Sequence, residues 1–241
     1  MRVKAWTAWL PDRAGAGWQV WVNGRPVDTA AHNSTSSSGE PPVLLRRRVS
    51  KLGQAALRAA WELDESATAR LIFASRHGEF GRTLSILDSL AQEAEVSPAD
   101  FTLSVHHALA GLLSIARKNR QGHTTVAAGT ESFYSGLLEA AMCLAERPAE
   151  PVVLVYYDEP LPDPYNHFSA PGEETIVLAL ALTSDEGRDG LRISYESVAP
   201  GAEAETNPGN AFLSFMTGPA ARTTVVGERL AWRLEKFNAA A

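Results

Sequence analysis

A short strand-like segment, a glycine and an amphipathic helix follow one another between residues 124 and 144, and this succession constrains the fold more than any other feature. Thr124 to Ala128 is short and partly β-branched, which suits a buried strand. Gly129 permits the sharp bend that joins a strand to a helix. Apolar residues then recur at helical spacing and predict one buried stripe, formed by Phe133, Leu137, Ala140, Ala141 and Leu144.

The turn at residues 129–131, called the elbow below, is of a kind that can hold a reactive side chain. Unpaired N–H groups and the positive end of the helix dipole meet where the helix begins. A cysteine there would have a lowered pKa and would act as a nucleophile. This chain has Thr130 and Glu131 instead, and its single cysteine, Cys143, lies three turns further on. We therefore expect an elbow without a nucleophile and no catalytic residue.

Two serines beside the elbow leave an enzymatic alternative open. Ser132 or Ser135, with His107 or His77 as a base, would make the chain a small serine-dependent acyltransferase or hydrolase. A structural role at the helix start is the simpler interpretation of Ser132. The sequence contains no G-x-S-x-G, no P-loop, no G-x-G-x-x-G and no Cys/His metal set. We therefore expect no cofactor and no metal.

Apolar runs and helical patterns alternate along the chain, as in an α/β protein. Unbroken apolar runs at residues 151–157 and 175–182 are typical of strands covered on both faces, and residues 70–75 are predicted to form a further buried strand. Helices are predicted at 50–63, at 106–118 and at 83–95, where Leu84, Leu87 and Leu90 should be buried. The spacing of Val226, Leu230, Leu234 and Phe237 predicts a further amphipathic helix near the C-terminus.

Composition limits the class of protein. The chain has 241 residues, 45% of them hydrophobic, which is enough for one substantial core, so we expect a single domain over 1–241 with a flexible loop at about 29–42. The net charge of −6 provides no general basic field for nucleic acid. One cysteine excludes an internal disulfide. No long apolar run follows the N-terminal charges, so we expect no signal peptide, no membrane span and a cytoplasmic protein.

Several of these segments resemble the thiolase-like β-ketoacyl synthases, in particular their chain length factor branch. The resemblance rests on Ser104-Val-His-His-Ala-Leu-Ala-Gly-Leu-Leu-Ser-Ile, on Gly122 before the strand, on the elbow, and on Gly-Leu-Leu-Glu-Ala at residues 136–140. In this family the elbow carries an acyl-accepting cysteine. Its position falls on Thr130 when counted back from Ala140, and on Glu131 when counted forward from Gly122.

The resemblance covers roughly the first half of a ketosynthase, whereas the family's catalytic histidines and lysine belong to the second half. It implies a thiolase-like half-fold, one layer set of the duplicated architecture. We accordingly expect a mixed, mostly parallel, five-stranded sheet with helices on both faces.

The resemblance also implies a function. The chain would be a non-catalytic chain length factor that forms a heterodimer with a full-length β-ketoacyl-ACP synthase, completes its acyl tunnel and limits chain length by sterics, as in aryl polyene pathways. The residues expected at the partner interface and tunnel are Phe101, His107, Thr124, Thr125, Val126, Ala127, Ala128, Phe133 and Tyr134. A homodimeric acyl-binding scaffold is a further alternative.

Three consecutive arginines, Arg46, Arg47 and Arg48, form a candidate contact for an acyl carrier protein with its phosphopantetheine-linked acyl chain. Guanidinium groups suit phosphate geometry. A solvated edge with no ligand is the alternative interpretation of the same run.

Overall fold

The computed structural model describes residues 1–12, 17–28, 40–64, 66–170, 172–184, 189–199 and 201–238. Most of the predicted loop at 29–42 lies outside these residues, and only 40–42 can be compared; they form no helix or strand. Within the described chain, no helix is long and apolar enough to cross a membrane.

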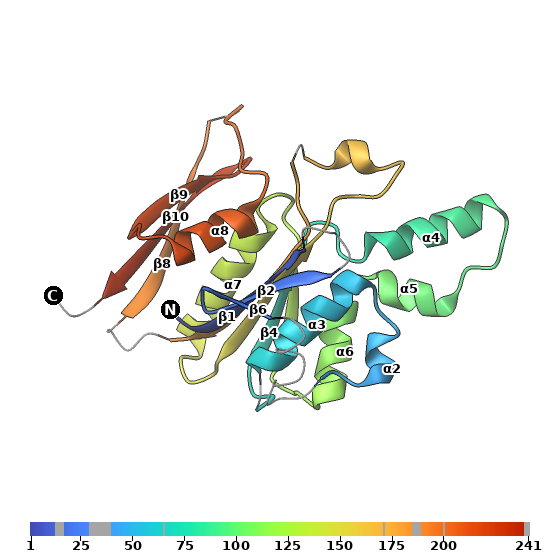
Figure 1. Cartoon of the computed structure of the whole chain (residues 1–241), viewed down its shortest axis with the longest axis horizontal. Helices are drawn as coiled ribbons and strands as arrows, with labels where there is room; N and C mark the ends of the chain where they lie inside the picture. Colours follow the sequence, from blue (N-terminus) through green and yellow to red (C-terminus); the bar gives the residue numbers. More distant parts are fainter. Residues whose placement is uncertain are drawn as a thin grey trace.

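Seven of the described strands form one mixed sheet in the order β3-β2-β1-β7-β6-β4-β5 (Figure 1). Their bounds are β1 Arg2–Pro11, β2 Trp18–Val22, β3 Arg25–Val27, β4 Arg70–Ala74, β5 His123–Val126, β6 Val152–Asp158 and β7 Ile176–Thr183. The strands predicted at 70–75, 151–157 and 175–182 are therefore confirmed.

The sheet differs from the expected one in size and direction. Strand β4 pairs in parallel with β5 and β6, while β6–β7, β7–β1, β1–β2 and β2–β3 are antiparallel. The expectation of a mostly parallel, five-stranded sheet is thus wrong in both respects. The first ten residues and the hairpin after them extend the sheet through antiparallel partners, which need no helical crossover.

A second, antiparallel sheet of three strands has the order β8-β10-β9. Its strands are β8 Asp189–Ser197, β9 Arg222–Val226 and β10 Leu230–Asn238. The helix expected from Val226 to Phe237 is therefore wrong. Leu230 and Leu234 are four residues apart, which fits both a helical stripe and one face of a strand, and the core position of Trp232 between them selects the strand.

Helix α7 (Ser132–Glu146) lies between the two sheets and contributes to one hydrophobic core with both (Figure 1). That core joins Leu154 of the large sheet, Leu137 of α7 and Trp232 of the small sheet. Helix α8 (Pro208–Thr217) packs beside α7. A Cβ at Gly136 would lie only 2.8 Å from Cβ of Ala74, so glycine is what lets α7 approach the sheet.

The other face of the large sheet is covered by α3 (Lys51–Leu63) and α6 (Ala108–Arg117), which form a second core with it. Helix α2 (Val43–Arg46) precedes α3. The described chain therefore has four layers: α3 and α6, the large sheet, α7 and α8, and the small sheet. The prediction of helices on both faces is confirmed.

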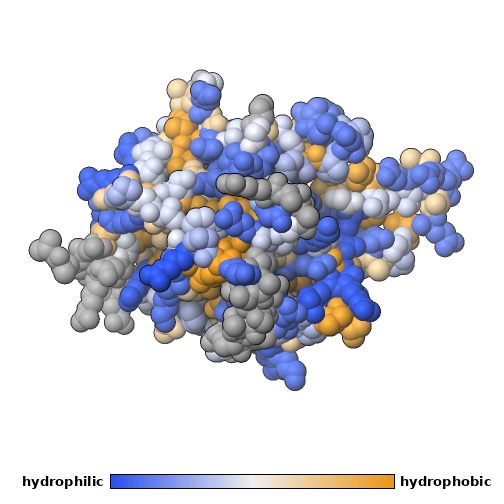
Figure 2. Space-filling model, viewed as in Figure 1, coloured by the Kyte–Doolittle hydropathy of each residue, from blue (hydrophilic) through white to orange (hydrophobic). Residues whose placement is uncertain are grey.

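Two helices, α4 (Phe80–Ala91) and α5 (Pro98–Ser104), pack against each other and project from the body as an arm (Figure 1). No residue of α4 is buried; Leu87 is 41% exposed and Leu90 58%. The prediction that Leu84, Leu87 and Leu90 are core residues is therefore wrong, although the apolar stripe exists. Figure 2 shows hydrophobic residues reaching the surface along this arm.

Candidate functional site

The elbow has the predicted geometry. Strand β5 ends at Val126, Gly129 has a φ of 62° in the left-handed region, and α7 begins at Ser132. That conformation is the one a glycine adopts at no steric cost. Two backbone bonds close the turn, from the N–H of Glu131 to the oxygen of Ala128 and from that of Ser132 to the oxygen of Gly129, both 3.2 Å.

The side chain of Glu131 is turned into the protein and held there. It is 2% exposed, and its Oε1 accepts hydrogen bonds from the backbone N–H groups of Arg229 and Leu230, each 2.8 Å long. The guanidinium of Arg229 lies 3.4 Å from Oε2. A Cβ at Gly227 would meet Oε1 at 2.5 Å, so that residue also fits closely against the carboxylate. Glu131 therefore fixes the β9–β10 turn onto the elbow.

Within the described part of the chain, the hydroxyl of Thr130 in the elbow and that of Ser132 next to it are hydrogen-bonded to no basic side chain. Thr130 Oγ1 is buried without a hydrogen-bond partner among the described residues. Ser132 is 1% exposed; its Oγ donates to the oxygen of Gly129 (2.7 Å) and accepts from the N–H of Ala128 (2.9 Å). No hydrogen bond of the described chain joins Ser132 or Ser135 to a histidine. The geometry therefore gives no support to the serine-dependent alternative.

Phe133 and Tyr134, expected at the partner's tunnel, are core residues. They are 0% and 1% exposed; Phe133 packs against Phe212, and Tyr134 stacks on Trp232 with ring centroids 5.7 Å apart. Burial raises the pKa of Tyr134 far above its usual range, and its hydroxyl donates to the oxygen of Pro208. Because neither side chain reaches the surface, the expectation that they line a partner's tunnel is wrong.

The remaining residues of the predicted interface do reach the surface. Strand β5 is the last strand of the large sheet, so Thr124, Thr125 and Val126 lie along its open edge and are partly exposed. Ala127 is exposed and Ala128 partly so. Phe101 on α5 is 64% exposed.

His107 links α6 to this edge. Its Nδ1 lies 3.0 Å from Oγ1 of Thr125, and its Nε2 lies 3.1 Å from Nδ1 of His123. Burial, with the nearby His107 and Arg70, lowers the pKa of His123. The edge therefore has a row of polar side chains that hold one another in place. Among the described residues, no group of three or more potential ligands occurs.

The arginine run has unequal surroundings. Arg46 forms a salt bridge of 3.0 Å with Glu40, and the carbonyl oxygen of Arg48 accepts a hydrogen bond from Arg82. The side chains of Arg47 and Arg48 are exposed.

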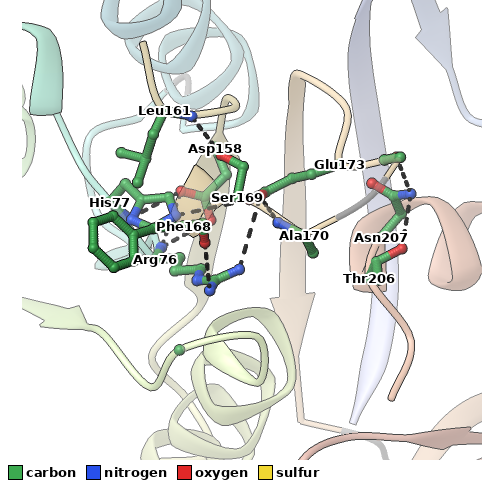
Figure 3. A network of polar contacts seen from close by, with 12 residues as sticks. Arg76, His77, Asp158, Leu161, Phe168, Ser169, Ala170, Glu173, Thr206 and Asn207 are labelled. Atoms are coloured by element: carbon green, nitrogen blue, oxygen red, sulfur yellow. Dashed lines mark hydrogen bonds and ion pairs between the residues drawn. The ribbon is translucent and has the colours of Figure 1, made fainter. Parts of the chain in front are cut away.

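Sequence reasoning missed a buried carboxylate at the carboxyl end of β6 (Figure 3). Asp158 is 2% exposed and accepts hydrogen bonds from Ser75 Oγ (3.0 Å), the N–H of Arg76 (2.8 Å) and the N–H of His77 (3.1 Å). Burial raises the pKa of Asp158 to about 6, although these donors oppose the shift. An acidic residue that directly ends an unbroken apolar strand was the available signal.

His77 lies in the turn that follows β4, two residues after Ser75. Its Nε2 is 3.9 Å from Oε1 of Glu173, and burial, together with Arg76 and His106, lowers the pKa of His77 to about 4. Glu79 instead binds Ser50 and Arg82. The turn after β4 therefore joins that strand to the loop after β6 through neutral and charged hydrogen bonds.

Comparison with known proteins identifies the family. The family described as beta-ketoacyl synthase, N-terminal domain, matches residues 18–234. No curated protein matches the chain. A chain in the structure of the ketosynthase ApeO in complex with its chain length factor ApeC, from Xenorhabdus doucetiae, is similar with a TM-score of 0.73 and 24% identity, over 98% of this chain and 99% of that one.

A beta-ketoacyl synthase from Burkholderia phymatum STM815 is similar with a TM-score of 0.52 and 12% identity, over 73% of this chain and 55% of that one. The chain thus aligns with little more than half of that synthase. These likenesses confirm the thiolase-like α/β half-fold expected from the sequence. With the match over residues 18–234, the chain belongs to the beta-ketoacyl synthase N-terminal domain family.

Proposed function

We propose that this protein is a non-catalytic ketosynthase-like subunit that pairs with a full-length β-ketoacyl-ACP synthase and limits the length of the chain made there. The observation that carries the proposal is the closed elbow: Glu131 is bound by main-chain amides of the β9–β10 turn, beside an open sheet edge. The elbow has no thiol to accept an acyl group from a thioester, and Oε1 of its carboxylate is already bound by two amides, so the proposal assigns the condensation chemistry to the partner.

The open edge of β5 supports pairing with another chain. Among the described strands β5 has a neighbour only on the β4 side, which leaves unpaired N–H and C=O groups on the other side. Thr124, Thr125, Val126, Ala127 and Ala128 lie on or next to this edge. Strand addition there would extend the sheet into the partner.

The arm formed by α4 and α5 offers exposed apolar side chains that would enlarge the proposed interface. Phe101 is 64% exposed, Leu90 58% and Val105 49%, and Val105 lies between α5 and the His107 end of α6. Exposed large apolar side chains on a projecting helix pair indicate a protein interface. Together with the β5 edge they favour an interface of the obligate size class.

The relative in the ApeO and ApeC complex supports the choice of partner. That structure pairs a ketosynthase with a chain length factor, and the matched chain is of nearly the same length as this one, since the match covers 98% and 99% of the two. We infer that this chain takes the place of the chain length factor in such a pair. Aryl polyene-type biosynthesis and a cytoplasmic location stay predictions.

Chain length would be limited by sterics at the partner's acyl tunnel. The surface residues Phe101, His107, Thr125 and Ala128 are the candidates for closing the tunnel, because Phe133 and Tyr134 are buried in the core of this chain. We also propose that Arg47 and Arg48 contact the phosphopantetheine phosphate or the acidic surface of an acyl carrier protein.

Co-expression with the ketosynthase encoded beside it, followed by size exclusion and mass determination, tests the pairing. We expect a one-to-one complex that condenses only when both chains are present. Phe101→Glu should weaken that complex at least tenfold, while Tyr195→Glu should not. Tyr195 is also an exposed aromatic (53%), but it lies on β8, far from the arm (Figure 1).

A chain that forms only homodimers in the presence of the ketosynthase would refute the heterodimer and favour the scaffold alternative. Self-acylation of the isolated chain would refute the non-catalytic assignment.

A further inference from the structure

A groove of about 1040 Å³ lies between α8, the segment before it and the edge of β9. Its walls are formed largely by small side chains and by the strand itself; the lining includes Ala204, Ala211, Ser214, Phe215, Ala220 and Thr224. It belongs to the small sheet, whose β9–β10 turn binds Glu131 of the elbow, whereas the β5 edge belongs to the large sheet. The groove is therefore a second surface of the molecule on which a ligand has room.

The edge of β9 that faces away from β10 has unpaired main-chain groups. Within the described strands, β9 pairs only with β10. The N–H of Lys236 bonds to the oxygen of Ala221, and that of Gly227 to the oxygen of Leu230. Because hydrogen-bonded positions alternate along an antiparallel pair, the N–H and C=O of Thr224 point away from β10.

One residue of the chain itself already pairs with this edge of β9. The N–H of Glu205 donates to the oxygen of Val226 at 2.8 Å, which is the outward carbonyl at the end of β9. The pairing does not continue, so Thr224 and Arg222 keep their outward groups. An open strand edge next to a groove is the arrangement that proteins use to bind extended segments.

The wall opposite the strand is held firmly in place. The ammonium group of Lys236 donates to the oxygens of Phe215 and Gly218 at the C-terminal end of α8, at 2.6 and 3.0 Å. The same group lies 4.5 Å from the ring centroid of Phe215. Because a cation on β10 caps α8, the groove is already formed in the free chain, which lowers the entropy cost of binding.

The charge of the groove indicates the kind of segment that fits. The charged side chains among its described lining residues are Glu203 and Glu205, and both are acidic. One carboxylate oxygen of Glu205, Oε1, accepts a hydrogen bond from the N–H of Asn207 at 2.8 Å. The side chain of Glu203 is exposed. A basic side chain of the ligand would therefore be attracted to the end of the groove beside Glu203.

We propose that this groove binds an extended, basic segment of another protein, which adds as a strand to the free edge of β9. The main chain of the segment pairs with Thr224, small side chains fit against α8, and a lysine or arginine lies beside Glu203. This binding does not depend on the pairing with a ketosynthase proposed above, because it uses a different edge and a different sheet.

Fluorescence anisotropy with the full chain tests the proposal. The probe is a labelled synthetic peptide about eight residues long, in which valine and threonine alternate between terminal lysines, and its twin has glutamates at the ends. We expect saturable binding of the basic peptide with a Kd of about 0.1 mM, and binding of the acidic twin at least tenfold weaker. Glu203→Lys should reverse that preference.

Two variants at Thr224 separate strand pairing from side-chain contact. Thr224→Pro removes the outward N–H and should abolish binding, whereas Thr224→Ala keeps the main chain and should bind as the wild type does. Unfolding midpoints are measured for both, and Glu203→Lys, at an exposed position, provides a second variant that keeps the fold.

Absence of saturable binding by the basic peptide below about 1 mM would overturn the proposal. Equal binding of the two peptides, or an unchanged preference in Glu203→Lys, would overturn the acidic recognition. Undiminished binding by a folded Thr224→Pro would overturn strand addition.

Discussion

Replacing Glu131 with alanine removes the carboxylate that ties the elbow to the β9–β10 turn. Oε1 of Glu131 accepts two main-chain hydrogen bonds of 2.8 Å, from Arg229 and Leu230, and the side chain is 2% exposed. In Glu131→Ala the two N–H groups lose their acceptor in a position that water reaches poorly. The turn can satisfy them only by moving away from the elbow.

The size of the effect follows from those two donors. A buried donor left without a partner costs about 1–3 kcal/mol. These groups are partly buried, so we take the lower half of that range for each and expect Glu131→Ala to lower the free energy of unfolding by about 3 kcal/mol. The ion pair with Arg229 adds little, since that guanidinium is 70% exposed. Glu131→Gln keeps an acceptor oxygen and should lose about 1 kcal/mol.

Equilibrium unfolding in urea, followed by tryptophan fluorescence, measures these differences. Trp232 lies on β10, directly after the turn, so its emission reports on the affected region. Glu228→Ala is the matched control, because Glu228 belongs to the same turn and is exposed; it should change stability by less than about 0.5 kcal/mol. A Glu131→Ala protein as stable as the control would refute the reasoning.

Further predictions concern pH and packing. The pKa of Asp158 is raised from 3.8 to about 6, so its stabilising contribution is complete below pH 3.8 and is lost as pH rises through 6. On acidification from pH 7 to 5, the wild type should therefore gain stability relative to Asp158→Asn, as measured by urea midpoints. The pKa of His77 is lowered from 6.5 to about 4, so its stabilising contribution is complete above pH 6.5 and is lost as pH falls through 4. The stability of His77→Gln relative to the wild type should therefore be higher at pH 5 than at pH 7. The same stability difference between the two proteins at both pH values would contradict this. Phe133→Ala should cost about 3–5 kcal/mol of stability, whereas Phe101→Ala should cost less than about 0.5 kcal/mol and affect only association; the reverse order in urea unfolding would show that Phe133 is not a core residue. Gly136→Ala should cost about 1–3 kcal/mol in the same assay, because its Cβ would overlap with the large sheet, and a neutral result would contradict the close approach.

Much of the elbow could be predicted from residues 124–144, because its signals are local. A β-branched run, a glycine and a helical stripe specify strand, turn and helix through backbone sterics and side-chain period. The direction of the Glu131 side chain was not predictable. Its partners, the amides of Arg229 and Leu230, are about a hundred positions away, and backbone N–H groups have no signature in the sequence.

Periodicity identified apolar faces without saying what covers them. The stripe of α4 was recognised, but Leu87 and Leu90 are exposed, because α4 projects from the body with α5. The stripe after the elbow predicts that Phe133 is buried, and Phe133 does pack against Phe212 of α8. Tyr134 lies outside that stripe, yet it is equally buried because Trp232 of the small sheet covers it. Whether an apolar face meets the core, a partner or solvent is decided by tertiary packing.

The sequence by itself determined the family, the strands β4, β6 and β7, the elbow and the lack of a cysteine in it, since each of these depends on residue types at short spacing. Only the tertiary structure decided that the C-terminal segment forms β9 and β10 rather than a helix, and that this hairpin closes over the elbow. The spacing of Leu230 and Leu234 fits both conformations, and the choice came from the uncovered face of α7, which a sheet with Trp232 directed inward covers.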